Sequence, residues 1–435
     1  MLPPLLDVLA RKMPNLIVTD RYAFAGVDVG VALSIPFVVN SASILMDIDY
    51  PPNIIPAPFS NISVHTSRVI DRCLNVCYRL LFRFTWIQIY RQLNENRKRT
   101  GLDQNMDKPH HLTLVNSVFG LDVPRAMSPQ HQMVGLLACT QQPTRMESCV
   151  PDTQRLPAQL WSWMVSLEKA RPLLLITLPC PSLHDPVFQW IHHVIRKIGF
   201  RAIWKVASDF NVSENNSTSI YYLQSDTIEE ISILQQIASL SAVIISGDAQ
   251  LVLYALAFGL PILGIPETAE QLEHLNAVAR AGAGVVALPS SLSMDRIAEL
   301  LRRLRYDNGL RTAAARLGKL LNTTGGTKRA VDSIVSVLEF GISHLTPQRC
   351  VQSWIQSYFV DVYALYGILL GVVVISLCAF SSVLYSVLQS TCARYRETTD
   401  PKARTVGKES NVKQNNKKKR AAAKLRTLNN HGASI

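Results

Sequence analysis

The sequence predicts an α/β protein with two Rossmann-like domains, the first of them incomplete, followed by one transmembrane helix. Three observations lead to this fold class. Short apolar runs alternate with amphipathic stretches of helix length, which is typical of parallel strands joined by helices. A proline-rich break at residues 51–58 and an irregular stretch ending near Arg155 interrupt this alternation. Finally, no charged residue occurs for 32 positions between Asp361 and Arg394.

The first series of elements spans residues 1–155, which we predict as a partial N-terminal domain. Its strands are short and apolar, and its helices carry apolar residues at helical spacing. The predicted elements are helices at 5–13, 22–33 and about 64–99, and strands at 16–19, 35–40 and about 112–124, the last leading into an irregular connector.

The second series spans residues 156–345, and repeated strand–helix units of this length predict a parallel sheet with right-handed crossovers. Ser293 is the predicted N-cap of one closing helix. The predicted strands are 173–178, 201–206, 220–224 and 242–246, and the predicted helices begin at about residue 157 and cover 186–198, 227–239, 249–258, 293–305, 308–321 and 327–340.

The uncharged segment at residues 362–388 exceeds the roughly 20 apolar residues that cross a bilayer, so we predict a transmembrane helix there. Residues 346–361 form an interfacial linker in this interpretation, and residues 394–435 form a disordered basic tail. That tail holds twelve Lys or Arg against three Asp or Glu, which leaves only +3 of the net charge of +12 for the rest of the chain. The near-neutral folded part argues against nucleic-acid binding. The positive-inside rule places the tail in the cytosol.

Other features bear on the compartment. Triplets for N-glycosylation precede the predicted span, as expected of a lumenal domain, and begin at Asn61, Asn211, Asn215, Asn216 and Asn322. The first residues lack the pattern of a signal sequence, so we expect the N-terminal part of a longer architecture to be absent. The cysteines show no metal-type spacing, and we predict no metal site. Cys139 and Cys149 could pair, and Cys392 is either acylated or an ordinary thiol.

One run, residues 242–284, carries the most specific pattern: a strand, a glycine turn, a helix, a second strand and a carboxylate–amide pair. Ser246, Gly247 and Asp248 make the turn, and Glu270 and Gln271 make the pair. Backbone N–H groups at a helix N-terminus favour an anion because their peptide dipoles align. The run therefore predicts a site for a phosphate-bearing ligand with hydroxyl groups.

These motifs resemble the UDP-glycosyltransferases, the UDP-glucuronosyltransferase-like family of GT-B fold, from about residue 7 to residue 340 and through the anchor. Besides the run above, the resemblance rests on four segments. They are 15–20, 32–39, Thr177-Leu-Pro-Cys180 and Gly259-Leu-Pro261 with Pro266.

The resemblance implies a metal-independent, inverting transfer of a hexosyl or glucuronosyl group to a small lipophilic acceptor, with a UDP-sugar as co-substrate and no other cofactor. It implies a location in the endoplasmic reticulum membrane. Asp20 matches the family's Asp that orients a catalytic His, and that His lies upstream of the Asp, whereas residues 1–19 contain no histidine. The implied donor-binding residues are Thr177, Ser246, Gly247, Asp248, Gln250, Glu270 and Gln271.

Several positions depart from the family pattern. The family has His-Gly-Gly at 246–248, Ser at Leu251 and Glu at Tyr254, and Asp248 puts an anion where a phosphate is expected. The aromatic residue that stacks on the uracil has no counterpart at 228–236. These departures keep a second interpretation open: a catalytically inactive relative that acts as a membrane-anchored binding or regulatory partner, in a homo- or hetero-oligomer.

Overall fold

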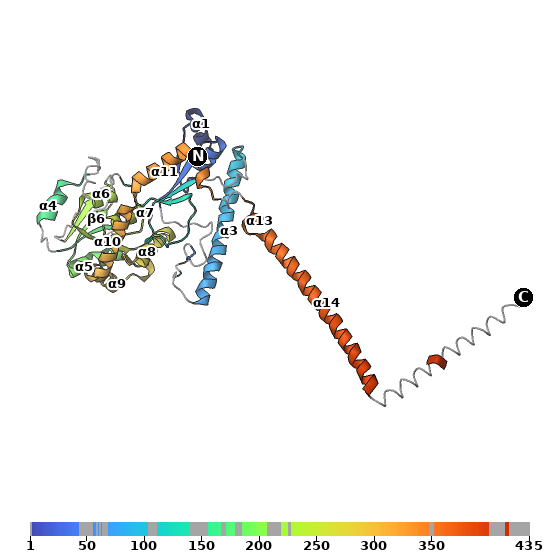
Figure 1. Cartoon of the computed structure of the whole chain (residues 1–435). Helices are drawn as coiled ribbons and strands as arrows, with labels where there is room; N and C mark the ends of the chain where they lie inside the picture. The colour runs from blue at the N-terminus through green and yellow to red at the C-terminus, as the bar shows by residue number, and fades with distance from the viewer. Residues whose placement is uncertain are drawn as a thin grey trace, which may run out of the picture. The chain divides into compact units, whose positions relative to one another are not determined.

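The computed structural model describes residues 2–42, 55–57, 60, 62, 68–102, 111–138, 155–166, 171–178, 185–206, 219–224, 228–347, 352–399 and 414–416. Two compact units divide the chain at Pro347. The unit Met1–Pro347 holds two parallel sheets, and the unit Gln348–Ile435 holds a long helix (Figure 1).

The first sheet has the order β1-β2-β3-β4, and every pair is parallel. The order runs in one direction without the reversal of a doubly wound sheet. Its elements are α1 (Leu2–Lys12), β1 (Ile17–Asp20), α2 (Phe24–Ala32), β2 (Phe37–Ser41), α3 (Val69–Arg99), β3 (Leu112–Val115) and β4 (His131–Met133). Strand β4 lies in the stretch predicted as an irregular connector, because three residues are too few to show an alternating pattern.

The second sheet has the order β10-β9-β8-β5-β6-β7 and is parallel throughout, which confirms the predicted Rossmann-like arrangement. Its strands are β5 (Leu173–Thr177), β6 (Arg201–Val206), β7 (Ile220–Gln224), β8 (Leu240–Ile245), β9 (Ile262–Gly264) and β10 (Gly284–Val286). The connecting helices are α4 (Ala158–Ser166), α5 (Pro186–Ile198), α6 (Glu230–Gln236), α7 (Ala249–Ala257) and α8 (Ala269–Arg280).

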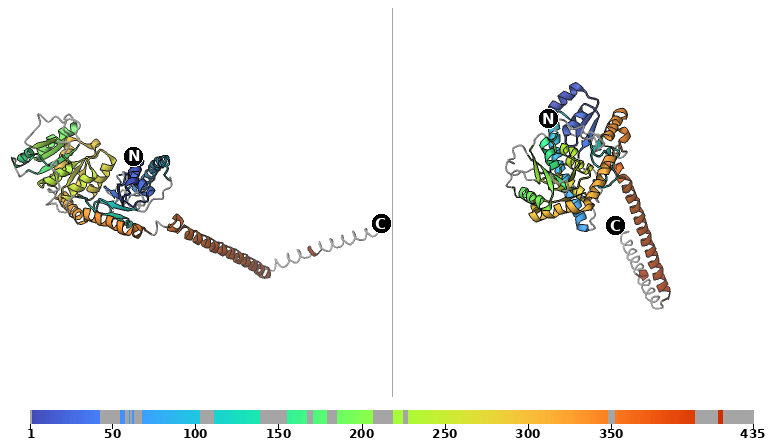
Figure 2. Two further views of the ribbon diagram at one scale, coloured as in Figure 1. Left: turned by 90° about the horizontal axis from the view of Figure 1, so that it is seen from above. Right: turned by 90° about the vertical axis from the view of Figure 1, so that its left-hand side faces the viewer.

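Helices cover both faces of the second sheet because its strand residues alternate between two cores. Leu174 and Ile176 of β5 face a core with α5 and with α9 (Met294–Tyr306). Leu173 and Leu175 face the opposite core, which includes α7 and α10 (Asn308–Thr323). The helices flanking the sheet are visible in both views of Figure 2. Ser293 caps α9 as predicted, since its hydroxyl accepts the N–H of Arg296 at 3.2 Å.

The last helix of this unit, α11 (Gly326–Phe340), packs on the first sheet. Ala330 and Val337 share a core with Val38, Leu112 and Leu114. The N–H of Gly326 donates to the carbonyl of Val134 at 2.8 Å. Two short 3₁₀ turns, Pro289–Ser291 and Ser343–Leu345, complete the unit.

The C-terminal unit contains α13 (Trp354–Ser357) and α14 (Val360–Thr399). Residues Val360–Arg396 have a window of mean hydropathy 2.5 and no buried residue, so this helix is long and apolar enough to cross a membrane. It contains the predicted span and continues through Thr399, into the segment predicted as a disordered tail.

Candidate functional site

The second sheet grows from β5 through β6 and β7 toward one edge, and from β8 through β9 and β10 toward the other. Its strand order therefore reverses between β5 and β8, and several of the predicted donor residues follow these two strands. Thr177 ends β5 and is in register with Ile245, the last residue of β8. Ser246 and Gly247 follow directly. In open α/β sheets, ligands bind outside the carboxyl ends of the strands where the strand order reverses. The fold therefore brings Thr177, Ser246 and Gly247 together at the carboxyl ends of β5 and β8, where the strand order reverses. The hydroxyl oxygen of Thr177 is buried without a hydrogen-bond partner.

The turn after β8 requires glycine. Gly247 has φ of +107°, and a Cβ built on it would lie 2.8 Å from the carbonyl oxygen of Gln271 and 2.8 Å from Cγ of Leu275. The carbonyl oxygen of Gly247 lies 3.0 Å from Nδ1 of buried His274. These contacts hold the amino-terminal part of α8 against the turn, so Gly247 lies next to the backbone of Gln271.

Asp248 closes the N-terminus of α7. Its Oδ1 accepts the backbone N–H groups of Gln250 and Leu251, each at 3.0 Å. A carboxylate is a strong N-cap because it satisfies donors that have no partner within the helix. The chain's own carboxylate thus occupies the amides that the sequence analysis assigned to phosphate.

Two other departures from the family pattern point into the protein. Leu251 and Tyr254 are 7% and 5% exposed, and both belong to the core on one face of the second sheet. Gln250 is exposed on the same helix. Leu251, at the position where the family carries Ser, therefore packs in the core of this domain.

Helix α8 begins with a capping box, in which Thr268 accepts the N–H of Gln271 at 3.2 Å. In return, Oε1 of Gln271 accepts the N–H groups of Glu267 at 2.8 Å and Thr268 at 3.1 Å. The side-chain oxygen of Gln271 is thus engaged within its own helix start, whereas the Glu270 side chain is exposed. The assignment of both residues to the donor sugar stays a prediction.

Asp20 ends β1, and its Oδ1 accepts the N–H of Tyr22 at 2.9 Å in the turn that follows. Burial raises the pKa of the Tyr22 hydroxyl. The carboxylates of Glu270 and Asp20 raise it further, while Arg21 lowers it. The turn after β1 and the amino end of α8 are thus near enough to interact electrostatically.

A cluster that the sequence analysis missed lies at the carboxyl ends of β2 and β3. Ser41 and Ser117 are 1% and 0% exposed, Asn116 is 8% exposed, and Asn40 precedes Ser41. The side-chain oxygens of all four are buried and have no hydrogen-bond partner among the described residues. Buried polar groups normally have partners, so orphaned oxygens at strand ends mark a place for a polar ligand or water. The signal in the sequence is a repeat, Val39-Asn40-Ser41 and Val115-Asn116-Ser117.

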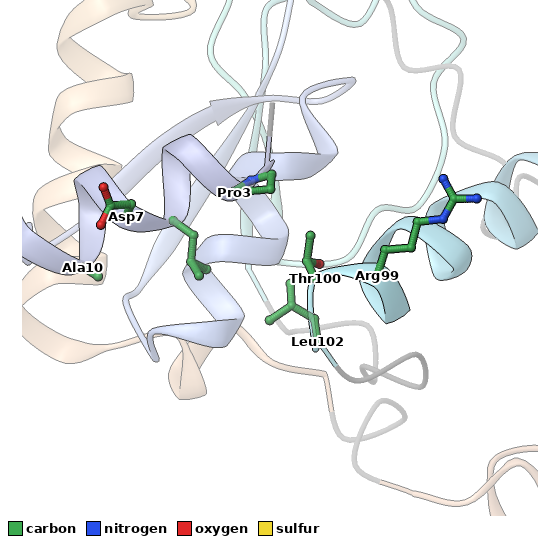
Figure 3. Close-up of a pocket in the computed structure, with 7 residues that line it drawn as sticks. Pro3, Asp7, Ala10, Arg99, Thr100 and Leu102 are labelled. Carbon is green, nitrogen blue, oxygen red and sulfur yellow. The ribbon is translucent and has the colours of Figure 1, made fainter.

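Figure 3 shows a separate pocket of about 420 Å³ between α1 and the end of α3. Its lining residues are Pro3, Leu6, Asp7, Ala10, Arg99, Thr100 and Leu102. None of them lies at the carboxyl end of a strand, so this pocket is distinct from the site described above.

Comparison with known proteins agrees with this geometry. No family model matches the chain. The chain is 22% identical over 393 residues to human (Homo sapiens) UDP-glucuronosyltransferase 3A2, covering 84% of this chain and 71% of that protein. Among solved structures, it is similar to the glycosyltransferase of kitacinnamycin, with a TM-score of 0.56 at 16% identity over 78% of this chain and 79% of that one. It is also similar to the glycosyltransferase VinC in complex with dTDP, with a TM-score of 0.51 at 16% identity over 78% and 75% of the two chains.

The fold is therefore that of the GT-B glycosyltransferases, as the sequence predicted. The sequence comparison supports the UDP-glycosyltransferase-like family, again as predicted.

Proposed function

We propose that the chain is a UDP-glycosyltransferase that transfers a hexosyl or glucuronosyl group from a UDP-sugar to the hydroxyl of a small lipophilic acceptor. The observation that carries this proposal is the meeting of Thr177, Gly247 and the amino end of α8 where the second sheet reverses its strand order. The complex of VinC with dTDP supports a nucleoside diphosphate as the class of ligand.

The roles follow from the chemistry of each group. The unpartnered hydroxyl of Thr177 donates to a phosphate oxygen, and the N–H of Gly247 is a second donor for the diphosphate. Glu270 accepts hydrogen bonds from the sugar hydroxyls, whereas Gln271 donates to one through Nε2, because its Oε1 already accepts two backbone N–H groups. The orphaned oxygens at Asn116 and Ser117 receive polar groups of the acceptor. Inversion at the sugar needs a base that takes the proton of the acceptor hydroxyl while UDP leaves. Residues 1–19 contain no histidine for this role, so we give Asp20 an orienting role only and leave the base to be identified. We propose a metal-independent reaction in which the Gly247 N–H and the Thr177 hydroxyl bind the diphosphate, since Asp248 occupies the amides at the start of α7.

One observation favours a second function, that of a catalytically inactive relative which binds ligands or partners. Asp248 caps α7 with a carboxylate, and two negative groups within a few ångströms repel each other. A diphosphate at this helix end must approach that charge or displace the cap. In this alternative, the scaffold and the anchor serve a regulatory complex with another chain.

Calorimetric titration of the full chain in lipid nanodiscs with UDP tests whether the chain has the nucleotide site on which both proposed functions draw. We expect binding in the wild type, and about five- to tenfold weaker binding in Thr177→Val, which removes one hydroxyl and keeps the side-chain shape. Thr312→Val on α10, an exposed position, is the matched control and keeps the wild-type affinity.

Turnover separates the two functions. UDP-glucose or UDP-glucuronate with a phenolic acceptor gives a glycoside if the chain is the transferase. UDP binding without any glycoside supports the inactive relative, and no binding at millimolar UDP excludes a nucleotide site in either form.

We further propose that α14 anchors the chain in the endoplasmic reticulum membrane, with the folded unit in the lumen as a glycoprotein. Asn322 is the glycosylation triplet within the described residues, and its side-chain N–H donates to the carbonyl of Ala257 at 3.2 Å. The other four triplets lie outside the described residues. A mobility shift on treatment with an N-glycosidase that persists in Asn322→Gln would place a glycan on at least one of the other four triplets and the folded unit in the lumen.

A further inference from the structure

The side of helix α3 that faces the rest of the protein is held by polar side chains. Asn75 is 4% exposed, and its Oδ1 accepts the N–H of Ala57 at 2.5 Å while its Nδ2 donates to the carbonyl of Ile55 at 3.0 Å. The guanidinium of Arg79 donates to the same carbonyl. Because Asn75 and Arg79 are four residues apart, they lie on one side of the helix.

Two further contacts fix the rotation of α3 near its other end. Arg97 forms an ion pair with Asp28 of α2 at 2.6 Å, and the two side chains are 13% and 4% exposed. The ring of Trp86 packs edge-on against Phe24, with centroids 6.4 Å apart. A buried ion pair is costly to break because it leaves an uncompensated charge, so these contacts determine which side of α3 faces away from the protein.

The outward side is apolar over residues 69–87. At about 100° per residue, its large apolar side chains fall within an arc of about 160°. They are 41% to 72% exposed: Val69, Ile70, Leu74, Val76, Leu80, Leu81, Phe84 and Ile87. Scattered apolar side chains are ordinary on a protein surface, but a contiguous stripe of this kind marks an interaction surface.

Charge on α3 indicates what covers this stripe. The helix holds seven Lys or Arg against two Asp or Glu. Arg72 and Arg83 border the apolar arc on one side, and Arg91 follows it. A second copy of the chain would bring these cations against one another, whereas anionic lipid phosphates complement them.

The connection to α14 keeps this unit close to a bilayer. The unit ends at Pro347 and α14 begins at Val360. A connection of about a dozen residues spans at most about 40 Å when fully extended. If α14 crosses a membrane, every surface of the unit experiences a high effective concentration of lipid, so even a weakly lipophilic surface binds.

We propose that the outer face of α3, residues 69–87, lies on the bilayer that α14 crosses. Its apolar side chains insert among the acyl chains, and Arg72, Arg83 and Arg91 contact lipid phosphates, as in an interfacial amphipathic helix. The protein covers the side of α3 that such a helix otherwise turns to water.

Hydroxyl-radical footprinting of the full wild-type chain tests this surface, with one chain per nanodisc and discs that contain phosphatidylserine. Tyr306 and Met294 on α9, 67% and 40% exposed, are internal references. We expect the side chains of Leu80 and Phe84 to react at least about fivefold more slowly than their exposure and intrinsic reactivity predict. Reaction at the rate set by their exposure overturns the proposal.

A matched pair of variants separates lipid contact from other protection. Leu80→Asp/Phe84→Asp places two charges on the stripe at exposed positions, and reaction at Leu74 and Leu81 then rises several-fold. Val331→Asp/Val335→Asp, an exposed apolar pair with the same spacing on α11, leaves that reaction unchanged. Protection that appears only with two chains per disc assigns the stripe to a second copy and contradicts the proposal.

Discussion

Nδ1 of His274 lies 3.0 Å from the carbonyl oxygen of Gly247, and this contact ties α8 to the turn at the end of β8. A carbonyl only accepts, so Nδ1 of His274 is the donor in this hydrogen bond. His274 is 3% exposed, and its Nε2 is buried without a partner. The ring therefore fixes the position of a backbone turn.

We predict that Gly247→Ala is strongly destabilising, because a non-glycine residue at φ of +107° is strained and its Cβ meets the backbone of Gln271. Gly282→Ala is the control: φ is +72° there, and the nearest atom, in Ala313, is 3.7 Å from the new Cβ. The excess destabilisation of Gly247→Ala is about 1–3 kcal/mol, measured by chemical denaturation. Equal effects of the two substitutions would show that the contact with α8 carries no strain.

Asp248→Ser retains an N-cap and removes the negative charge at the start of α7. We expect UDP to bind about five- to tenfold more tightly, because the diphosphate no longer meets a like charge. Calorimetry measures the affinity, and the thermal midpoint shows whether the cap is kept. Asp248→Ala, which loses the cap, lowers that midpoint. Unchanged UDP affinity in Asp248→Ser would place the diphosphate elsewhere.

Ser117→Ala is expected to leave stability unchanged or to raise it by up to about 1 kcal/mol, since it removes a buried hydroxyl without a partner. The same substitution raises KM for the acceptor if this hydroxyl contacts it. Ser333→Ala is the control, because the Ser333 hydroxyl bonds Oε1 of Gln132 at 2.6 Å and its removal destabilises. A loss of stability in Ser117→Ala equal to that in Ser333→Ala would show that Ser117 has a structural partner.

Stability should fall on acidification because of His192. Burial lowers the pKa of this imidazole from its ordinary value of 6.5, and the nearby Arg196 and His193 lower it further. The unfolded chain therefore binds the proton more readily, so unfolding becomes easier as pH falls through about 6.5. The thermal midpoint between about pH 7.5 and pH 5.5 drops less in His192→Leu than in the wild type. A midpoint with the same pH slope in both proteins contradicts this assignment.

Much of the fold is encoded in local periodicity. Apolar runs such as Leu173–Thr177 are long enough to be recognised as strands, and β5, β6, β7 and β8 lie where the pattern predicts them. Strand β10 and helix α8 were not predicted. Strand β4 was not predicted, because its three residues are too few to show a pattern and they are stabilised by pairing with β3. The rotation of α3 is equally non-local, since Asn75 is held by Ile55 and Ala57.

The assignment of the glycine turn and the carboxylate–amide pair to a donor site stays a prediction, and only part of their local arrangement could be predicted from the sequence. The glycine turn and the carboxylate–amide pair lie next to each other, as their order in the sequence indicated. The hydrogen bonds of the Gln271 side chain at the start of α8 could also be predicted from the sequence, because Thr268-x-x-Gln271 is a capping-box pattern. The effect of Glu270 on the pKa of Tyr22 could not be predicted from the sequence, since it depends on how the turn after β1 approaches α8.

Helix α11 limits how this protein can be dissected. It follows the second sheet in sequence, yet its apolar side chains pack on the first, and the hydroxyl of Thr327 donates to the carbonyl of Ala138 at 2.7 Å. A fragment cut near residue 155 would carry α11 without its binding surface, and the complementary fragment would lose a layer of its core. Recombinant expression of either piece should give aggregates, whereas co-expression of the two should restore a soluble complex.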